Sequence, residues 1–79
     1  MKYIKGLIEK RGIDNMDVYD WGAVCEHCIL KENNPDTTED EYDIYSRIRF
    51  LAYQIYSELQ EPIGEPLDII KGKILKELE

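Results

Sequence analysis

The chain has 79 residues, of which 43% are hydrophobic, and its 17 acidic and 10 basic side chains give a formal net charge of −7. This length suits a single domain over residues 1–79, and the apolar content counts against intrinsic disorder, which combines high net charge with few apolar residues. The negative charge argues against direct binding to nucleic acid or membranes, because their surfaces are also negative.

The first part of the chain predicts two helices joined around a glycine. Residues 2–11 place apolar side chains on one side of a helix and most charged ones on the other. Gly12 is expected to end this helix, since a glycine after the last turn readily adopts a positive φ. Asp14 or Asn15 then caps a second helix that runs to about Lys31. Its predicted buried stripe comprises Val18, Trp21, Val24, Cys25, Cys28 and Ile29, and its outer face Asp20, His27 and Lys31.

The longest predicted helix follows Thr38 and ends near Gln60. Thr38 and Glu41 have the spacing of a capping box, and Pro62 ends the helix because the residue before a proline leaves the helical region. Apolar residues cover most of the circumference, so this helix is expected to be central and surrounded by the others. Its main stripe is Ile44, Ile48, Leu51, Ile55 and Leu59. The tyrosines beside it are interpreted as core edge or as a partner-binding patch: Tyr42, Tyr45, Tyr53 and Tyr56.

The remaining segments complete a four-helix pattern. Residues 33–36, with Pro35, predict a turn, and a last helix over residues 66–78 begins with Pro66 as its first helical residue. Gly72 weakens this helix unless the helix is docked, or else permits a close approach of another helix. The sequence therefore predicts an all-α protein: a small four-helix domain with an αα-hairpin formed by the first two helices (residues 2–31), a central buried third helix and a C-terminal helix.

The most suggestive chemical motif is Cys-Glu-His-Cys at residues 25–28. On a helix, His27 lies on the opposite side from Cys25, which disfavours one shared metal ion. The two thiols stand in the second half of their helix, where the helix dipole disfavours a reactive thiolate. Cys25 and Cys28 are therefore interpreted as structural thiols, and His27 as a solvated histidine. No metal and no cofactor are predicted.

No pattern typical of an enzyme is present. The chain lacks a glycine-rich phosphate loop and the spacings of zinc proteases, serine hydrolases and EF-hands. We therefore expect a protein without enzymatic activity. The chain also lacks an apolar run long enough for a membrane span and the apolar segment of a signal peptide, and it has only two cysteines. These features predict a cytoplasmic protein.

Negative charge is concentrated in one stretch of the chain. Between Asp14 and Asp43, ten acids stand against one base, Lys31, a net charge of −9. Such a surface attracts a basic protein surface, although the same acids could serve only as helix caps and for solubility. The candidate partner-binding residues are Asp17, Asp20, Asp36, Glu39, Asp40, Asp43, Tyr42 and Tyr53.

These observations predict a protein-binding module, an inhibitor or regulator that docks on a basic protein surface. In composition alone, the chain is similar to small acidic helical inhibitors encoded by phages, and that resemblance implies imitation of nucleic acid phosphates. Two alternatives stay open. The tyrosines of the third helix could form a homodimer, or Cys25 and Cys28 could bridge two copies through zinc.

Overall fold

The computed structural model describes all residues, 1–79, and shows an all-α protein, as the sequence predicted. It measures 36 × 23 × 20 Å along its principal axes. None of its helices is both long enough and apolar enough to traverse a lipid bilayer. In chain order, the elements are α1 (Lys2–Arg11), a short 3-10 helix (Ile13–Asn15), α2 (Val18–Glu32), α3 (Glu39–Gln60) and α4 (Leu67–Glu77).

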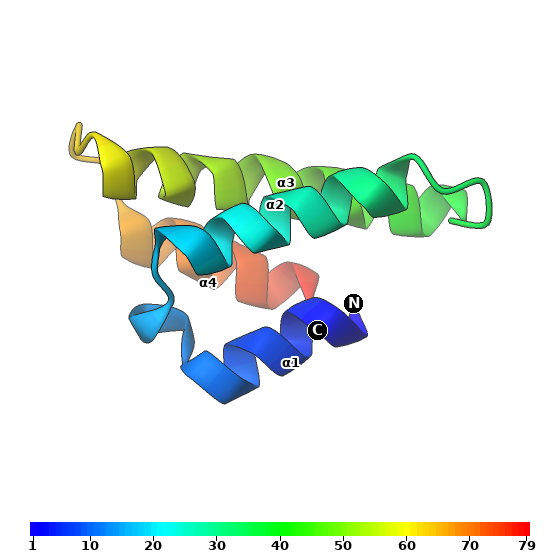
Figure 1. Ribbon diagram of the computed structural model, residues 1–79, viewed down its shortest axis with the longest axis horizontal. Coiled ribbons are helices and arrows are strands. Elements are labelled where there is room, and N and C mark those ends of the chain that lie inside the picture. Colours follow the sequence, from blue (N-terminus) through cyan, green and yellow to red (C-terminus); the bar gives the residue numbers. More distant parts are fainter.

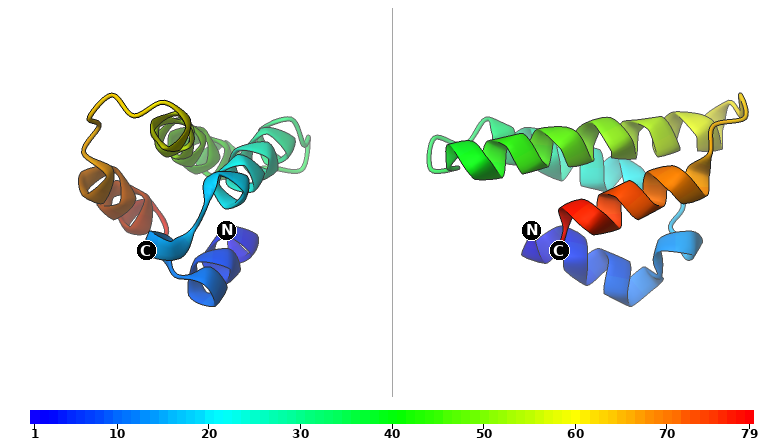
Figure 2. Two further views of the ribbon diagram at one scale, coloured as in Figure 1. Left: turned by 60° about the vertical axis from the view of Figure 1, so that its left-hand side comes forward. Right: turned by 180° about the vertical axis from the view of Figure 1, so that it is seen from behind.

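The architecture is built on a hairpin of two antiparallel helices, α2 and α3, whereas the sequence placed the hairpin at the first two helices. α2 packs along α3, and α4 packs against the other side of α3 (Figure 1). α1 lies below the hairpin, so the four helices surround a common core (Figure 2). The turn between α2 and α3 projects beyond the adjacent ends of α1 and α4 in both figures. We call this projecting end, residues 33–43, the hairpin tip.

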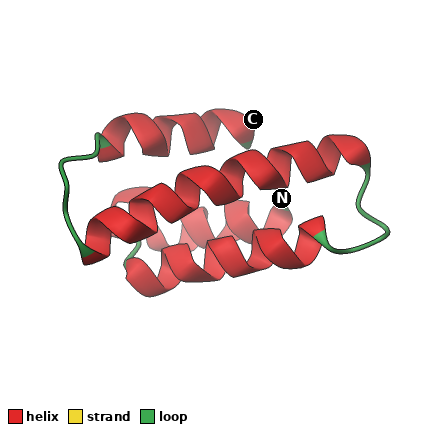
Figure 3. Ribbon diagram, turned by 90° about the horizontal axis from the view of Figure 1, so that it is seen from above, coloured by secondary structure: helices red, strands yellow, loops and turns green.

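The outer side of the hairpin is uncovered. Seen from above, α2 and α3 lie nearest the viewer and no other segment crosses the seam between them (Figure 3). The expectation that α3 is surrounded by protein is therefore wrong on this side. α3 does contact two neighbours, but α2 borders this face without covering it and α4 lies away from it.

The core is one cluster of buried side chains contributed by all four helices. Burying these apolar groups is the main term that stabilises the fold. Seven of the side chains are almost completely enclosed, Trp21 being the largest of them. The twelve members are Ile4, Met16, Trp21, Val24, Cys28, Tyr45, Ile48, Ala52, Ile55, Ile70, Ile74 and Leu78.

α2 begins later than the sequence predicted. Asp14 and Asn15 form the short 3-10 helix, and Asp17 is the actual N-cap. Asp17 accepts a hydrogen bond from the backbone N–H of Asp20 (2.9 Å), whose carboxylate accepts one from the N–H of Asp17 (3.2 Å). The delay has a tertiary cause: the backbone stays extended at Met16, whose side chain is buried in the core. The buried stripe of α2 is also narrower than predicted, since Ile29 is 47% exposed.

α3 has the predicted ends but a different inner face. Thr38 and Glu41 form the expected capping box, and the helix ends at Gln60. Tyr45 and Ala52 are buried, whereas Leu59 is 42% exposed. The remaining members of the predicted stripe are Ile48 and Ile55, which are buried, and Ile44 and Leu51, which are only partly buried. A helix that is apolar over most of its surface does not itself indicate which side faces its neighbours.

The connection to α4 is held by a buried carboxylate. Glu58, only 8% exposed, accepts hydrogen bonds from the backbone N–H groups of Ile63 and Gly64, both at 3.0 Å. The bond from Ile63 is the main cause of a lowered pKa for Glu58, and burial partly opposes it. Gly64 has φ +90°, a conformation that suits glycine. Glu58 thereby fixes the loop that returns the chain to the core.

α4 presents its predicted face to the core. Ile70, Ile74 and Leu78 are buried, and Leu67 packs partly against them. Pro66 is the N-cap and not the first helical residue, so the helix starts one residue later than predicted. A Cβ atom at Gly72 would meet nothing within 4 Å, so Gly72 does not serve a close helix approach.

Candidate functional site

The acids at the start of α2 are engaged within the molecule. The Nε of Arg11 lies 3.0 Å from Asp20, and its Nη2 lies 3.7 Å from Asp17. The Nζ of Lys71, on α4, lies 3.3 Å from Asp14. Asp17 and Asp20 also cap α2, as described above. These acids therefore present less free charge than the sequence count indicates.

Two further acids of the same segment have internal partners. Glu32 accepts two hydrogen bonds from Arg49, at 2.6 and 3.1 Å, and one from Ser46. Burial raises the pKa of Glu32, but these hydrogen bonds outweigh it and leave the pKa lowered. Glu41 bonds to Thr38 at the start of α3, which lowers the pKa of Glu41 as well.

Four unpaired acids lie close together at the hairpin tip. Asp36, Glu39, Asp40 and Asp43 are exposed, and their side chains form no ion pair and no hydrogen bond within the chain. Tyr42, 45% exposed, lies among them. The structure thus brings together five of the eight predicted partner-binding residues. Asp17 and Asp20 lie at the opposite end of α2, and Tyr53 lies midway along α3.

A groove follows the open seam between α2 and α3. Its main part has a volume of about 610 Å³ and is lined by residues of both helices. Gly22 lies on the α2 side, where an added Cβ would meet the ring of Tyr56 at 3.3 Å. The absence of a side chain there lets the two helices approach closely. The lining residues are Val18, Tyr19, Gly22, Ala23, Cys25, Glu26, Ile29, Tyr53, Tyr56 and Gln60.

Aromatic side chains form the walls of this groove. Tyr19 is 83% exposed and Tyr53 is 60% exposed, and the rings of Tyr53 and Tyr56 stack with centroids 6.1 Å apart. A smaller hollow of about 210 Å³ continues the groove towards the tip and shares Ile29 with it. Its lining is Ile29, Glu32, Asn33, Tyr42 and Arg49.

The α2 side of the groove was not predicted from the sequence. Tyr19, Ala23 and Glu26 recur at helical spacing opposite the buried stripe, and this spacing was the available signal. On α3, Tyr42 and Tyr53, two of the predicted partner-binding residues, are 45% and 60% exposed. Tyr45, by contrast, is buried, which agrees with the interpretation of the tyrosines as residues at the edge of the core.

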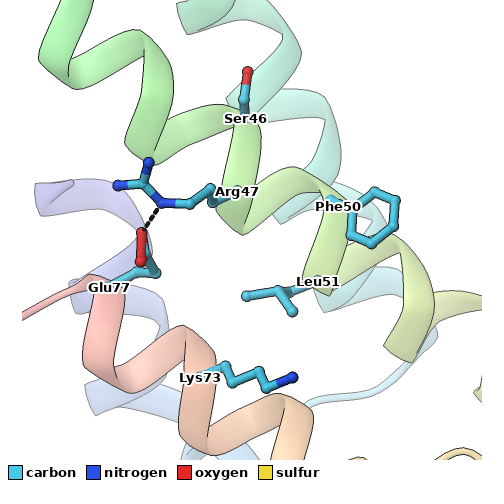
Figure 4. A pocket seen from close by; sticks show the side chains of 6 residues that line it. All are labelled: Ser46, Arg47, Phe50, Leu51, Lys73 and Glu77. Carbon is cyan, nitrogen blue, oxygen red and sulfur yellow. Dashed lines mark hydrogen bonds and ion pairs between the residues drawn. The ribbon is translucent and has the colours of Figure 1, made fainter.

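A second pocket lies between α3 and α4 (Figure 4). It has a volume of about 420 Å³, and Phe50 and Leu51 supply its apolar surface. The Nε of Arg47 reaches across to Glu77 at 2.6 Å, so this cation is neutralised. Lys73 lines the other side without an ion-pair partner. The pocket could therefore hold a small apolar group with a negative end, but Phe50 is 64% exposed and encloses it poorly.

The two cysteines lie near each other on α2 without forming a metal-binding group. Cys28 is completely buried, and burial raises its pKa to about 12. Burial also raises the pKa of Cys25, whose Sγ lies 4.0 Å from the carbonyl oxygen of Arg49. No group of three or more His, Cys, Asp or Glu side chains is arranged to hold a metal ion. A zinc bridge between copies would require Cys28 to leave the core.

His27 is not the solvated histidine that the sequence predicted. Its ring stacks on Tyr3 of α1, with centroids 4.5 Å apart, and meets the edge of Tyr45 at 5.9 Å. Burial lowers the pKa of His27, and the positive charge of Lys31 adds to this effect. His27 therefore joins α1 to the hairpin, and Lys31 lies near it, away from the open groove.

Comparisons of the chain with protein-family models, with curated proteins and with solved structures gave no match.

Proposed function

We propose that this protein is a non-enzymatic binding module whose hairpin tip docks on a basic surface of another protein, as an inhibitor or regulator. The observation that supports this most is the group of four unpaired acids at the tip. Asp36, Glu39, Asp40 and Asp43 collect beside Tyr42 at the turn of the hairpin, which projects beyond the adjacent ends of α1 and α4. A basic protein surface is the partner that complements them.

The tip has the composition of a recognition surface. Its carboxylates project into solvent, where they raise the rate of encounter with a positive partner through long-range attraction. Tyr42 supplies apolar area next to them and loses little conformational entropy on binding, which is why tyrosine is enriched at interfaces. Charge thus provides association rate and orientation, and the aromatic ring provides contact.

The test is quantitative capture of a partner by a tip variant in which Asp36, Asp40 and Asp43 become Asn and Glu39 becomes Gln. The purified protein is immobilised and exposed to a lysate of its source at low and at high salt. A partner captured by the wild type at low salt should be lost at high salt, because salt screens exposed charges. With the purified partner, the tip variant should associate about tenfold or more slowly at low salt.

The matched control removes the same amount of charge elsewhere. Glu9, Glu61, Glu65 and Glu79 become Gln, which changes the net charge equally but leaves the tip intact. This control should keep most of the wild-type association rate. Circular dichroism verifies that both variants are folded. If the tip variant and the wild type bind the partner with the same rate and salt dependence, the proposal is wrong.

One version of the proposal is imitation of nucleic acid phosphates. In that version the partner surface itself binds nucleic acid, so duplex DNA or RNA added to the complex should displace the protein. Competition by nucleic acid, absent with an uncharged polymer, supports the version. A partner that binds nucleic acid and this protein at the same time would exclude phosphate imitation, but docking of the tip on a basic surface would still stand.

A further inference from the structure

We infer that the open groove between α2 and α3 binds an amphipathic α-helix with basic flanks, contributed by the partner protein. This inference rests on the proposed function, because it takes the partner to be basic, and it identifies the form of the segment that is bound. The groove shares Asn33 and Tyr42 with the tip, but it is tested with variants of other residues, so the two proposals can fail separately.

The dimensions of the groove fit a helix. From Val18 to Asn33 the lining residues follow about four turns of α2, roughly 20 Å. Two neighbouring antiparallel helices offer a long hollow into which the side-chain ridges of a third helix can pack. Nothing in this protein fills that hollow, since α1 and α4 lie on the other side of the hairpin.

The chemistry of the walls also favours a helix over an extended segment. Both walls are helices, whose backbone N–H and C=O groups are already bonded to one another. An extended segment would leave its own backbone groups unpaired against apolar side chains, which is costly. A helix satisfies its own backbone, and its apolar residues can pack between Tyr19 and Tyr53, over Ala23.

The charges around the groove select a basic partner over a second copy. Glu26 lines the groove without a cation, and the acids of the tip stand at one end of it. Arg49 is the only cation in the lining, and Glu32 neutralises it. Two copies joined across this face would bring these negative charges together, in a protein whose net charge is −7. A helix with Lys or Arg on both flanks complements the groove instead.

The experiment uses a synthetic peptide with the length of the groove, with Leu and Ala on one helical face and Lys on both flanks. Titration calorimetry and backbone amide chemical shifts of the full chain report binding. The peptide should bind and shift the amide resonances of Gly22, Ala23 and Tyr53 more than those of α4. No binding at peptide concentrations up to about 1 mM, which corresponds to roughly −4 kcal/mol, would overturn the inference.

Two variants locate the binding site. Tyr19→Ala with Tyr53→Ala removes the two exposed walls and should weaken peptide binding at least about tenfold. Phe50→Ala with Ile69→Ala removes exposed apolar groups outside the groove, and should leave the affinity within about twofold of the wild type. Equal losses in both variants would contradict the inference, because the peptide would then bind apolar surface in general.

Peptide controls separate the groove from simple charge attraction. A peptide of the same composition, shuffled so that it has no apolar face, should bind much more weakly. If it binds equally well, the groove inference fails but docking of the acidic tip stands. If the tip variant captures the partner unchanged while the Tyr19→Ala, Tyr53→Ala variant does not, the tip proposal fails and the groove stands. A dimer in sedimentation experiments that the tyrosine variant dissolves would show a second copy as occupant, and would overturn the inference.

Discussion

The two ends of the α2–α3 hairpin both carry acids but use them differently. Where α2 begins, Asp17 and Asp20 cap the helix and contact Arg11, and Asp14 contacts Lys71. At the tip, Asp40 and its neighbours contact no cation. The sequence count of charge is therefore a poor measure of the charge that a partner encounters. The charge that a partner encounters depends on whether elements remote in sequence bring cations to the acids.

The largest expected difference between the two ends is in packing. Ile55 lies in the core, whereas Leu30, one turn before the tip, is 65% exposed. Ile55→Ala should lower the free energy of unfolding by about 2–5 kcal/mol, because it leaves a cavity. Leu30→Ala should change it by less than about 0.5 kcal/mol. Leu51→Ala, at the partly open α3–α4 pocket, should fall between them. Urea unfolding measures all three, and equal losses for Ile55 and Leu30 would show that the tip is not a separate, uncovered region.

The next difference is between an acid that caps a helix and one that does not. Asp17→Ala removes the N-cap of α2 and should cost about 0.5–2 kcal/mol of stability. Asp40→Ala removes one charge near the start of α3 and should cost less, about 0.3–1 kcal/mol through the helix dipole. The expected ranking reverses for binding, where only Asp40→Ala slows association. A binding defect in Asp17→Ala that exceeds its loss of folded protein would contradict the division of roles.

Carboxylates that accept hydrogen bonds within the protein should also make its stability depend on pH. The pKa of Glu32 and that of Glu58 are lowered in the folded protein, so folding favours their ionised forms. Their contribution to stability is complete above the ordinary glutamate pKa, about 4.3, and is lost as the pH falls through the lower folded value. Urea midpoints measured from neutral pH down to acid should therefore fall less steeply in Glu58→Gln than in the wild type. An unchanged slope would mean that the loop donors do not hold this carboxylate in solution.

The smallest expected effect belongs to the exposed pair of Lys71 and Asp14. The side chain of Asp14 is 79% exposed, so solvent screens the pair, and Lys71→Met should cost less than about 1 kcal/mol. The same variant frees a carboxylate where α2 begins. If this end of the hairpin then gains affinity for a basic peptide, its ion pairs with cations are what prevent it from binding such peptides in the wild type. Unchanged affinity would mean that position alone distinguishes the two ends.

Local signals in the sequence predicted the fold well. The capping box of Thr38 and Glu41, the stop before Pro62 and the inner face of α4 depend on residues close in the chain, and the structure confirms each. The start of α2 could not be predicted from such local signals, because Asp14, Asn15 and Asp17 are all suitable caps. The choice among them depends on the burial of Met16, which is set by contacts remote in sequence.

The candidate site was predictable in part for the same reason. The acids of the tip and Tyr42 are close together in the chain, so they must also be close in space whatever the rest of the fold. Their freedom from cations could not be predicted, because Arg11 and Lys71 are brought to the other acids by helices α1 and α4. The α2 side of the groove could not be predicted, because its residues have the pattern of an ordinary exposed helix face. Only the position of α3 beside α2 turns that face into one wall of a groove.

The way α1 is attached has a consequence for how the native protein opens. α1 is joined to α2 through Gly12, at φ +80°, and a single turn of 3-10 helix, and its own buried residue is Ile4. α2, α3 and α4 follow one another in the chain and pack as neighbours. α1 is therefore the element that can detach as a unit while the other three stay folded. Its amide protons should exchange with solvent at a lower opening free energy than those in the middle of α3. Because Trp21, the single tryptophan, is buried in the same core as Ile4, its fluorescence can report that partial opening directly.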